Sequence, residues 1–175
     1  MLFRSSAAAL ASECLDNALG EGTWRRSGAL TAAIEGPARL AGAEEVIVEL
    51  APDLAHDTAL RRIDGDVELG ARYAVRVSLA RKGHWVRIGR TPGDGDEKVA
   101  AWLAGNPIPS FGAADGGITV DSVVLEACIG TAPLSPVVGL PAGAPGVVSA
   151  VLSVDGASHL ACLPVLSGEG RVVPL

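Results

Sequence analysis

The chain has 175 residues, which is enough for one domain with a substantial core and too few for two ordinary domains. Apolar residues make up 49% of the chain and aromatic residues only 3%, so we expect a core of small aliphatic side chains and some apolar surface left for a partner subunit. The net charge of −6 argues against general binding to nucleic acid, and no apolar run approaches the roughly 20 residues that a membrane span requires.

Cysteine usage and the first residues indicate the compartment. Cys14, Cys128 and Cys162 are an odd number without a CxxC pair, which argues against a disulfide framework or a zinc knuckle and favours buried, inert thiols. The opening apolar run is too short and too mild for a signal peptide, so we interpret it as a helix. We therefore predict a soluble, cytoplasmic protein with a single domain over residues 1–175.

Two helices are predicted at the start of the chain. The first covers residues 5–20, with serine as the N-cap and Gly20 as its end. The second begins at Ser27, which we expect to cap it, and ends at Gly42. Gly36 and Pro37 should kink or split this second helix, because proline lacks a backbone donor and clashes with the preceding turn.

A short strand over residues 44–52 and an irregular polar connector over 53–70 come next. Residues 74–91 then alternate between apolar and polar, which predicts a hairpin with its turn at 81–84. In this register Ser78 lies opposite Arg87 and Arg76 opposite Gly89. Arg76 and Arg87 would thus lie diagonally on one face.

The second half of the chain is predicted to be mainly strands. A short helix containing Trp102 precedes a strand within residues 117–130. Residues 146–166 form a hairpin about Asp155-Gly156, and a last strand lies at 171–175.

Basic residues are concentrated around the predicted hairpin. Eight of the 14 lysine and arginine residues fall between Arg61 and Arg90. Arg76 and Arg87 could hold an anion between parallel guanidinium groups. Alternatively, each arginine could pair with a carboxylate of this chain, for example Asp66, Glu68, Asp121 or Glu126.

The stretch GHWVRIGRT, residues 83–91, fits the motif GY-x-x-D-x-x-R-T without a gap. In this motif the chain resembles the methionine aminopeptidase, prolidase and creatinase family, which has the pita-bread fold. Arg90 and Thr91 match the motif, but Arg87 stands where the family has its second metal-binding aspartate. Counting back from Gly83, the first metal-binding aspartate falls at Arg76.

The later metal ligands of the family also lack counterparts. Residues 120–137 resemble the strand that carries the family's histidine but contain none, and residues 140–156 and 159–170 resemble the two strands that carry glutamates. The matching positions there are apolar or small residues, including Ala161 and Cys162. The resemblance implies an α+β, pita-bread-like fold, with a curved, mainly antiparallel sheet covered by helices and truncated in its second half.

Arginine offers only hydrogen-bond donors and stays charged, so it would repel divalent cations. We therefore expect no metal, no cofactor and no catalytic residue in this chain, and lean away from an enzyme. The predicted role is subunit assembly, as a homo-oligomer or hetero-oligomer, or ligand binding. The alternative is a metal-independent enzyme or a peptide-binding module in which Arg76, Arg87, His84 and Arg90 hold a small anionic ligand.

The remaining histidines are predicted to be structural. His56 lies between Asp53 and Asp57 in the polar connector, where solvated or capping side chains are the usual case. His84 is expected to pack or to line a rim. His159 follows a hairpin turn and is expected to be exposed.

Overall fold

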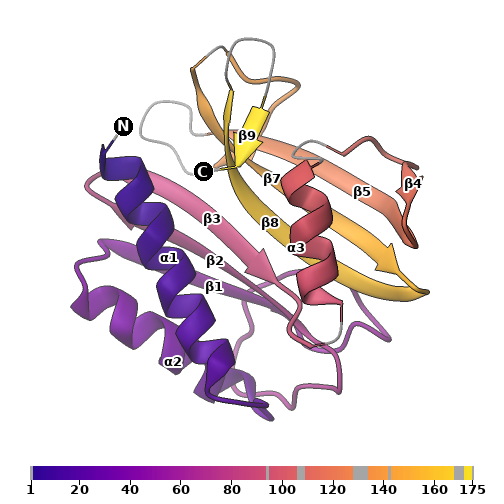
Figure 1. The fold of residues 1–175 in the computed structure, drawn as a ribbon. Helices are drawn as coiled ribbons and strands as arrows, with labels where there is room; N and C mark the ends of the chain where they lie inside the picture. The colour runs from indigo at the N-terminus through magenta and orange to yellow at the C-terminus, as the bar shows by residue number, and fades with distance from the viewer. Residues whose placement is uncertain are drawn as a thin grey trace.

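The fold consists of one curved sheet with helices on one of its faces (Figure 1). The structure is a computed structural model that describes residues 2–93, 95–105, 109–127, 134–141, 143–167 and 172–174. Its elements, in chain order, are α1 (Leu2–Gly20), α2 (Ser27–Leu40), β1 (Glu45–Ala51), β2 (Ala74–Arg81), β3 (His84–Arg90), α3 (Asp96–Gly105), β4 (Ala114–Asp115), β5 (Ile118–Ala127), β6 (Ser135–Pro136), β7 (Pro145–Val154), β8 (Ala157–Ser167) and β9 (Val172–Pro174).

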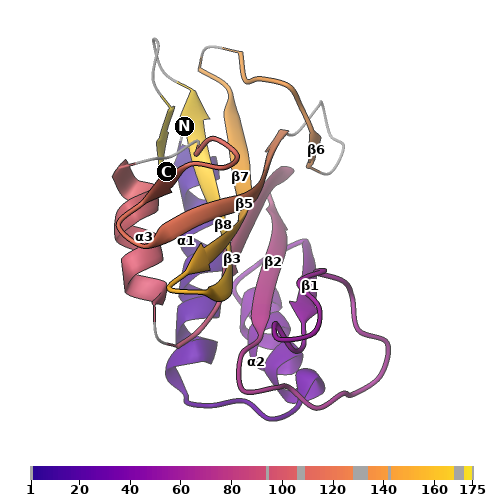
Figure 2. The same cartoon turned by 90° about the vertical axis from the view of Figure 1, so that its right-hand side faces the viewer.

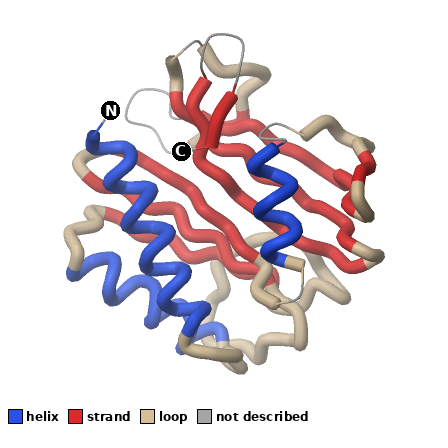
Figure 3. Tube along the Cα trace, viewed as in Figure 1, coloured by secondary structure: helices blue, strands red, loops and turns tan. Residues whose placement is uncertain are grey.

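The strands follow the order β1-β2-β3-β8-β7-β5-β4, with β6 paired to β5 and β9 paired to β8. Each of these pairs is antiparallel. The first three strands meet the later ones where Gly89 of β3 lies opposite Cys162 of β8. All three helices of the described chain lie in front of the strands in Figure 3. We call that side the helix-covered face and the other the helix-free face.

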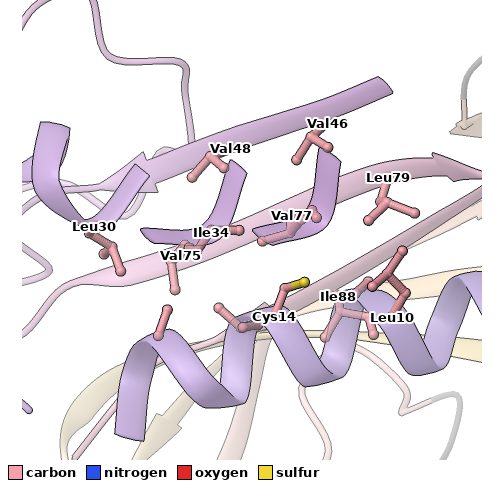
Figure 4. Packing of buried hydrophobic residues seen from close by; sticks show 14 of the residues in the cluster. Leu10, Cys14, Leu30, Ile34, Val46, Val48, Val75, Val77, Leu79 and Ile88 are labelled. Atoms are coloured by element: carbon pink, nitrogen blue, oxygen red, sulfur yellow. The ribbon is translucent and has the colours of Figure 1, made fainter. Parts of the chain in front are cut away.

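The larger core lies between α1, α2 and the first three strands. Alternate residues of β1 to β3 point at the helices, and the apolar side chains of α1 and α2 meet them (Figure 4). Each Val, Leu or Ile buried in this way contributes roughly 1.5–3 kcal/mol. A smaller core under α3 joins Val99 and Leu103 to Ile118, Val120 and Leu152.

The two predicted hairpins are confirmed. β2 and β3 pair with Ser78 opposite Arg87 and Arg76 opposite Gly89. Lys82 and Gly83 form the turn with φ of 51° and 72°. The β7–β8 hairpin turns at Asp155 and Gly156 with φ of 50° and 84°. Positive φ at both central positions gives a two-residue turn that follows the right-handed twist of its strands.

The second helix differs from the prediction. Its N-cap is Arg26, and the Ser27 hydroxyl instead accepts a hydrogen bond from the Val67 amide. The helix passes through Pro37 without a break and ends three residues later. Proline removes only one helical hydrogen bond so near the end, and buried Ile34 and Ala38 on either side of it keep the helix on the sheet.

The connector between β1 and β2 has neither helix nor regular strand, as predicted. Its first part folds onto the helix-free face, while Ile63 and Leu69 further along pack against the core under α1 and α2. On the helix-free face, Leu54 and Leu60 pack against Ala74 and Leu160. Figure 2 shows this fold from the side, with the connector leaving the sheet after β1. Within the residues described, no helix combines the length and the apolar character needed to cross a membrane.

Candidate functional site

The first of two arginine–carboxylate pairs on the helix-free face joins β2 to β1. Arg76 lies opposite Glu49 in the strand register. Its Nε and Nη2 donate to Glu49 Oε2 and Oε1, each at 2.9 Å, and both side chains are 17% exposed. Burial is the largest single effect and opposes the charge on Arg76, but the hydrogen bonds to Glu49 and the negative charges of Cys162, Glu49 and Glu126 together outweigh it and raise the pKa of the guanidinium. This two-fold contact is the strong geometry for an arginine–carboxylate pair.

The second pair crosses from β3 to β5. Arg87 donates through Nη1 to Glu126 Oε1 and through Nε to the Ser78 hydroxyl, 2.8 Å away. The other oxygen of Glu126 accepts a hydrogen bond of 3.0 Å from Ser149 of β7. The side chain of Arg87 is 14% exposed and that of Glu126 is 9% exposed. Four strands are therefore connected by side chains across the helix-free face.

A hollow of about 200 Å³ adjoins these pairs on the same face. Its lining comes from the connector, β2, β5, β7 and β8, and consists of Thr58, Leu60, Arg76, Ser122, Val124, Ser149, Ala150, Val151, Leu160 and Cys162. Cys162 is 1% exposed, and burial raises the pKa of its thiol. The closeness of β3 to this thiol favours glycine, since a Cβ on Gly89 would lie 3.0 Å from Cys162 Sγ.

The four residues predicted to share an anion site lie on two faces of the sheet. Arg76 and Arg87 lie together on the helix-free face, as the hairpin register predicted. His84 and Arg90 belong to the other alternating set of β3, with buried Val86 and Ile88, and point to the helix-covered face. There Arg90 Nε lies 4.0 Å from Asp16 Oδ1 of α1. The four side chains therefore do not converge.

The carboxylate partners were partly predicted from the sequence. Glu126 was one of the four acids considered, and it pairs with Arg87. Asp66 pairs instead with Arg26. Glu49, the partner of Arg76, was missed, although the alternation of residues 44–52 places it on the polar side of a strand that can pair with β2.

The described residues of the helix-free face are not arranged as a di-metal centre. Such a centre needs several carboxylates, and usually a histidine, to converge on the ions. The described residues contain no group of three or more His, Cys, Asp or Glu side chains arranged to hold a metal. The guanidinium groups of Arg76 and Arg87 instead engage the carboxylates that lie here.

Two further histidines were predicted to be exposed, and the structure confirms this for His56 and contradicts it for His159. His56 is exposed and bonds through Nδ1 to Asp53 Oδ2 at 2.8 Å. The prediction of an exposed His159 is wrong, because the side chain is only 2% exposed. In β8 it lies opposite buried Leu152, and Gly95 beside α3 closes over its ring. Its Nε2 accepts a hydrogen bond of 2.7 Å from Arg72 Nη2.

Two of the three cysteines lie within the described residues. Cys14 and Cys162 are buried free thiols, as predicted. Cys128 lies outside the described residues, as do residues 129–133 of the stretch that resembles the family's histidine strand.

No protein-family model matches the sequence, and no curated protein matches it. Solved structures do match. Prolidase from Pyrococcus furiosus is similar with a TM-score of 0.65 at 15% identity, over 98% of this chain and 62% of that chain. Prolidase from Pyrococcus horikoshii has a TM-score of 0.61 at 12% identity, over 98% of this chain and 60% of that chain. The dipeptidase PepE from Mycobacterium ulcerans has a TM-score of 0.53 at 16% identity, over 98% of this chain and 57% of that chain.

These similarities cover nearly all of this chain but less than two thirds of each solved structure, so the chain spans only 57% to 62% of their length. Its curved antiparallel sheet and its helices on one face agree with those structures. At such low identity the similarity concerns the fold. The chain has the pita-bread fold of the prolidases over about 60% of their length.

Proposed function

We propose that this chain is a non-catalytic protein of the pita-bread fold, which acts by assembling with another subunit or by binding a ligand. The observation that supports this most directly is the pair of contacts Arg76–Glu49 and Arg87–Glu126. They stand where the sequence motif places the metal-binding aspartates of the hydrolases. In this proposal a neutral network of hydrogen bonds has replaced the di-metal site.

The charges explain why such a replacement would be stable. Each guanidinium is matched by one carboxylate, so the four groups carry no net charge. Ser78 and Ser149 satisfy further hydrogen-bonding groups of Arg87 and Glu126. Buried ion pairs persist when their remaining donors and acceptors are bonded in this way. A divalent cation would have to displace an arginine to reach either glutamate.

Exposed apolar side chains support the assembly part of the proposal. Leu40 at the end of α2 is 92% exposed and Phe111 is 77% exposed. Val138, after β6, is fully exposed. These side chains lie on separate segments, so the apolar composition of the chain carries most of the support for contact with a second copy or with a different subunit.

Metal uptake and mass in solution test the two parts separately. The purified chain is incubated with an excess of Mn²⁺, Co²⁺ or Zn²⁺, desalted and analysed for bound metal. We expect well under one ion per chain. If the chain instead binds one or more ions, and substitution of Glu49 or Glu126 abolishes this binding, the proposal that the hydrogen-bond network has replaced the di-metal site is refuted. Size-exclusion chromatography with light scattering should show an oligomer. A monomer at micromolar concentration would leave ligand binding as the proposed role.

A further inference from the structure

The hollow on the helix-free face combines a polar end with an apolar wall. The strand register places Arg76, Cys162 and Ser149 side by side, because Arg76 lies opposite Gly89, Gly89 opposite Cys162 and Cys162 opposite Ser149. Thr58 and Ser122 add two further hydroxyl groups to the lining, and Leu60, Val124, Val151 and Leu160 supply aliphatic surface. A pocket lined mainly by apolar groups with a few fixed polar groups is the usual form of a site for a small molecule. The chemistry of these polar groups indicates which molecules fit.

The polar end offers one donor and one acceptor without net charge. Arg76 uses Nε and Nη2 for Glu49, so the N–H groups of Nη1 remain without an acceptor among the described residues. The Ser149 hydroxyl donates its hydrogen to Glu126, and its oxygen is also in hydrogen-bond contact with the Cys162 thiol, so one lone pair of this oxygen is left to accept a further hydrogen bond. A primary amide supplies both partners, since its carbonyl oxygen accepts and its N–H donates.

A carboxylate suits the same groups less well. It has no N–H for Ser149, and its charge would lie near Glu49 and Glu126, which already balance the two arginines. An added anion would therefore compete with these glutamates for the guanidinium groups. The arrangement favours an uncharged ligand over the anionic ligand considered from the sequence.

The size of the hollow limits the apolar part of such a ligand. An apolar cavity of about 150 Å³ accommodates benzene. A hollow of about 200 Å³ therefore fits an amide that carries a short branched aliphatic group against Leu60, Val124 and Leu160.

We propose that this hollow binds a small uncharged amide, with its carbonyl oxygen on Arg76, its N–H on Ser149 and its aliphatic group against the apolar wall. This inference rests on the proposed non-catalytic function, because it requires that Arg76 stay paired with Glu49 and that no metal occupy the face.

Two probes of nearly equal shape test the charge preference. 3-Methylbutanamide and 3-methylbutanoate are titrated into the full, isotope-labelled chain in EDTA, and binding is followed by backbone amide shifts of β7 and β8. A dissociation constant of about 1 mM is expected for so small an amide, and binding of the carboxylate should be at least about tenfold weaker. Carboxylate binding as tight as amide binding, or no amide binding at about 20 mM, would overturn the proposal.

Two exposed valines provide a matched pair of variants. Val124 is 42% exposed and lines the hollow, whereas fully exposed Val138 does not line it. Val124→Trp should fill the hollow and weaken amide binding at least about tenfold, while Val138→Trp should change it by less than about twofold. Equal effects of both substitutions would place the amide elsewhere.

A third variant tests the polar end. Arg76→Met combined with Glu49→Met keeps the face neutral but removes the donor, so amide binding should weaken about tenfold while folding persists. Unchanged affinity would refute the role of Arg76. Metal uptake, measured without EDTA, tests the proposed function independently. If the protein takes up no metal and also fails to bind the amide, the result contradicts the amide site but leaves the proposed function standing.

Discussion

Arg87 provides the sharpest test of the network on the helix-free face. Replacing Arg87 with Met leaves Glu126 buried with Ser149 as its remaining partner. At an effective dielectric constant of about 20, a pair of charges 4 Å apart interacts by about 4 kcal/mol. Breaking a buried pair from one side costs about 3–5 kcal/mol, because the other charge is left uncompensated. We therefore expect Arg87→Met to lower the free energy of unfolding by about 3 kcal/mol or more.

Two further variants serve as controls for the cost of removing Arg87. Arg26 also pairs with an acid, Asp66, but these side chains are 52% and 48% exposed, against 14% and 9% for Arg87 and Glu126. Arg26→Met should therefore cost at most about 1 kcal/mol. Arg87→Met combined with Glu126→Met should recover most of the loss, since well-packed apolar side chains can replace a buried pair.

Urea denaturation followed by circular dichroism measures all of these variants and yields the coupling between Arg87 and Glu126. If Arg87→Met is no more costly than Arg26→Met, the pair is effectively solvated and the network does not hold the sheet.

The other predictions concern buried groups on both faces. Burial and then the Arg72 charge lower the pKa of His159, so the unfolded state binds the proton more readily, and stability should fall as pH drops through about 6.5 and below. His159→Gln should reduce the loss of stability between pH 7 and pH 5, measured by urea denaturation at both pH values. If the pH dependence of stability is unchanged in this variant, other groups are responsible for it. Gly89→Ala should cost about 1–3 kcal/mol through contact with Cys162, while Gly36→Ala, which has open space around it but precedes Pro37 in α2, should change stability by less than about 1 kcal/mol. Thermal melts compare the two, and similar melting temperatures would contradict the tight packing at Gly89.

Local sequence patterns were sufficient to predict most of the helices and strands. The alternation of β2 and β3 predicted their register, and Lys82-Gly83 and Asp155-Gly156 formed the turns that such dipeptides favour. The same alternation also separates Arg90 from Arg87, because residues three positions apart in a strand point to opposite faces. The sequence by itself therefore indicates that His84 and Arg90 lie on the opposite face of the strand from Arg87.

Contacts between distant segments decided the rest. Glu49 reaches Arg76 only because β1 pairs with β2 after a connector of more than 20 residues, and Glu126 reaches Arg87 across β8 and β7. His159 is buried because Gly95 and α3 cover that end of β8, which no local signal near the Asp155-Gly156 turn indicates. Local patterning sets which face of a strand a side chain occupies, whereas its partner depends on which strands become neighbours, and only the tertiary structure determines that.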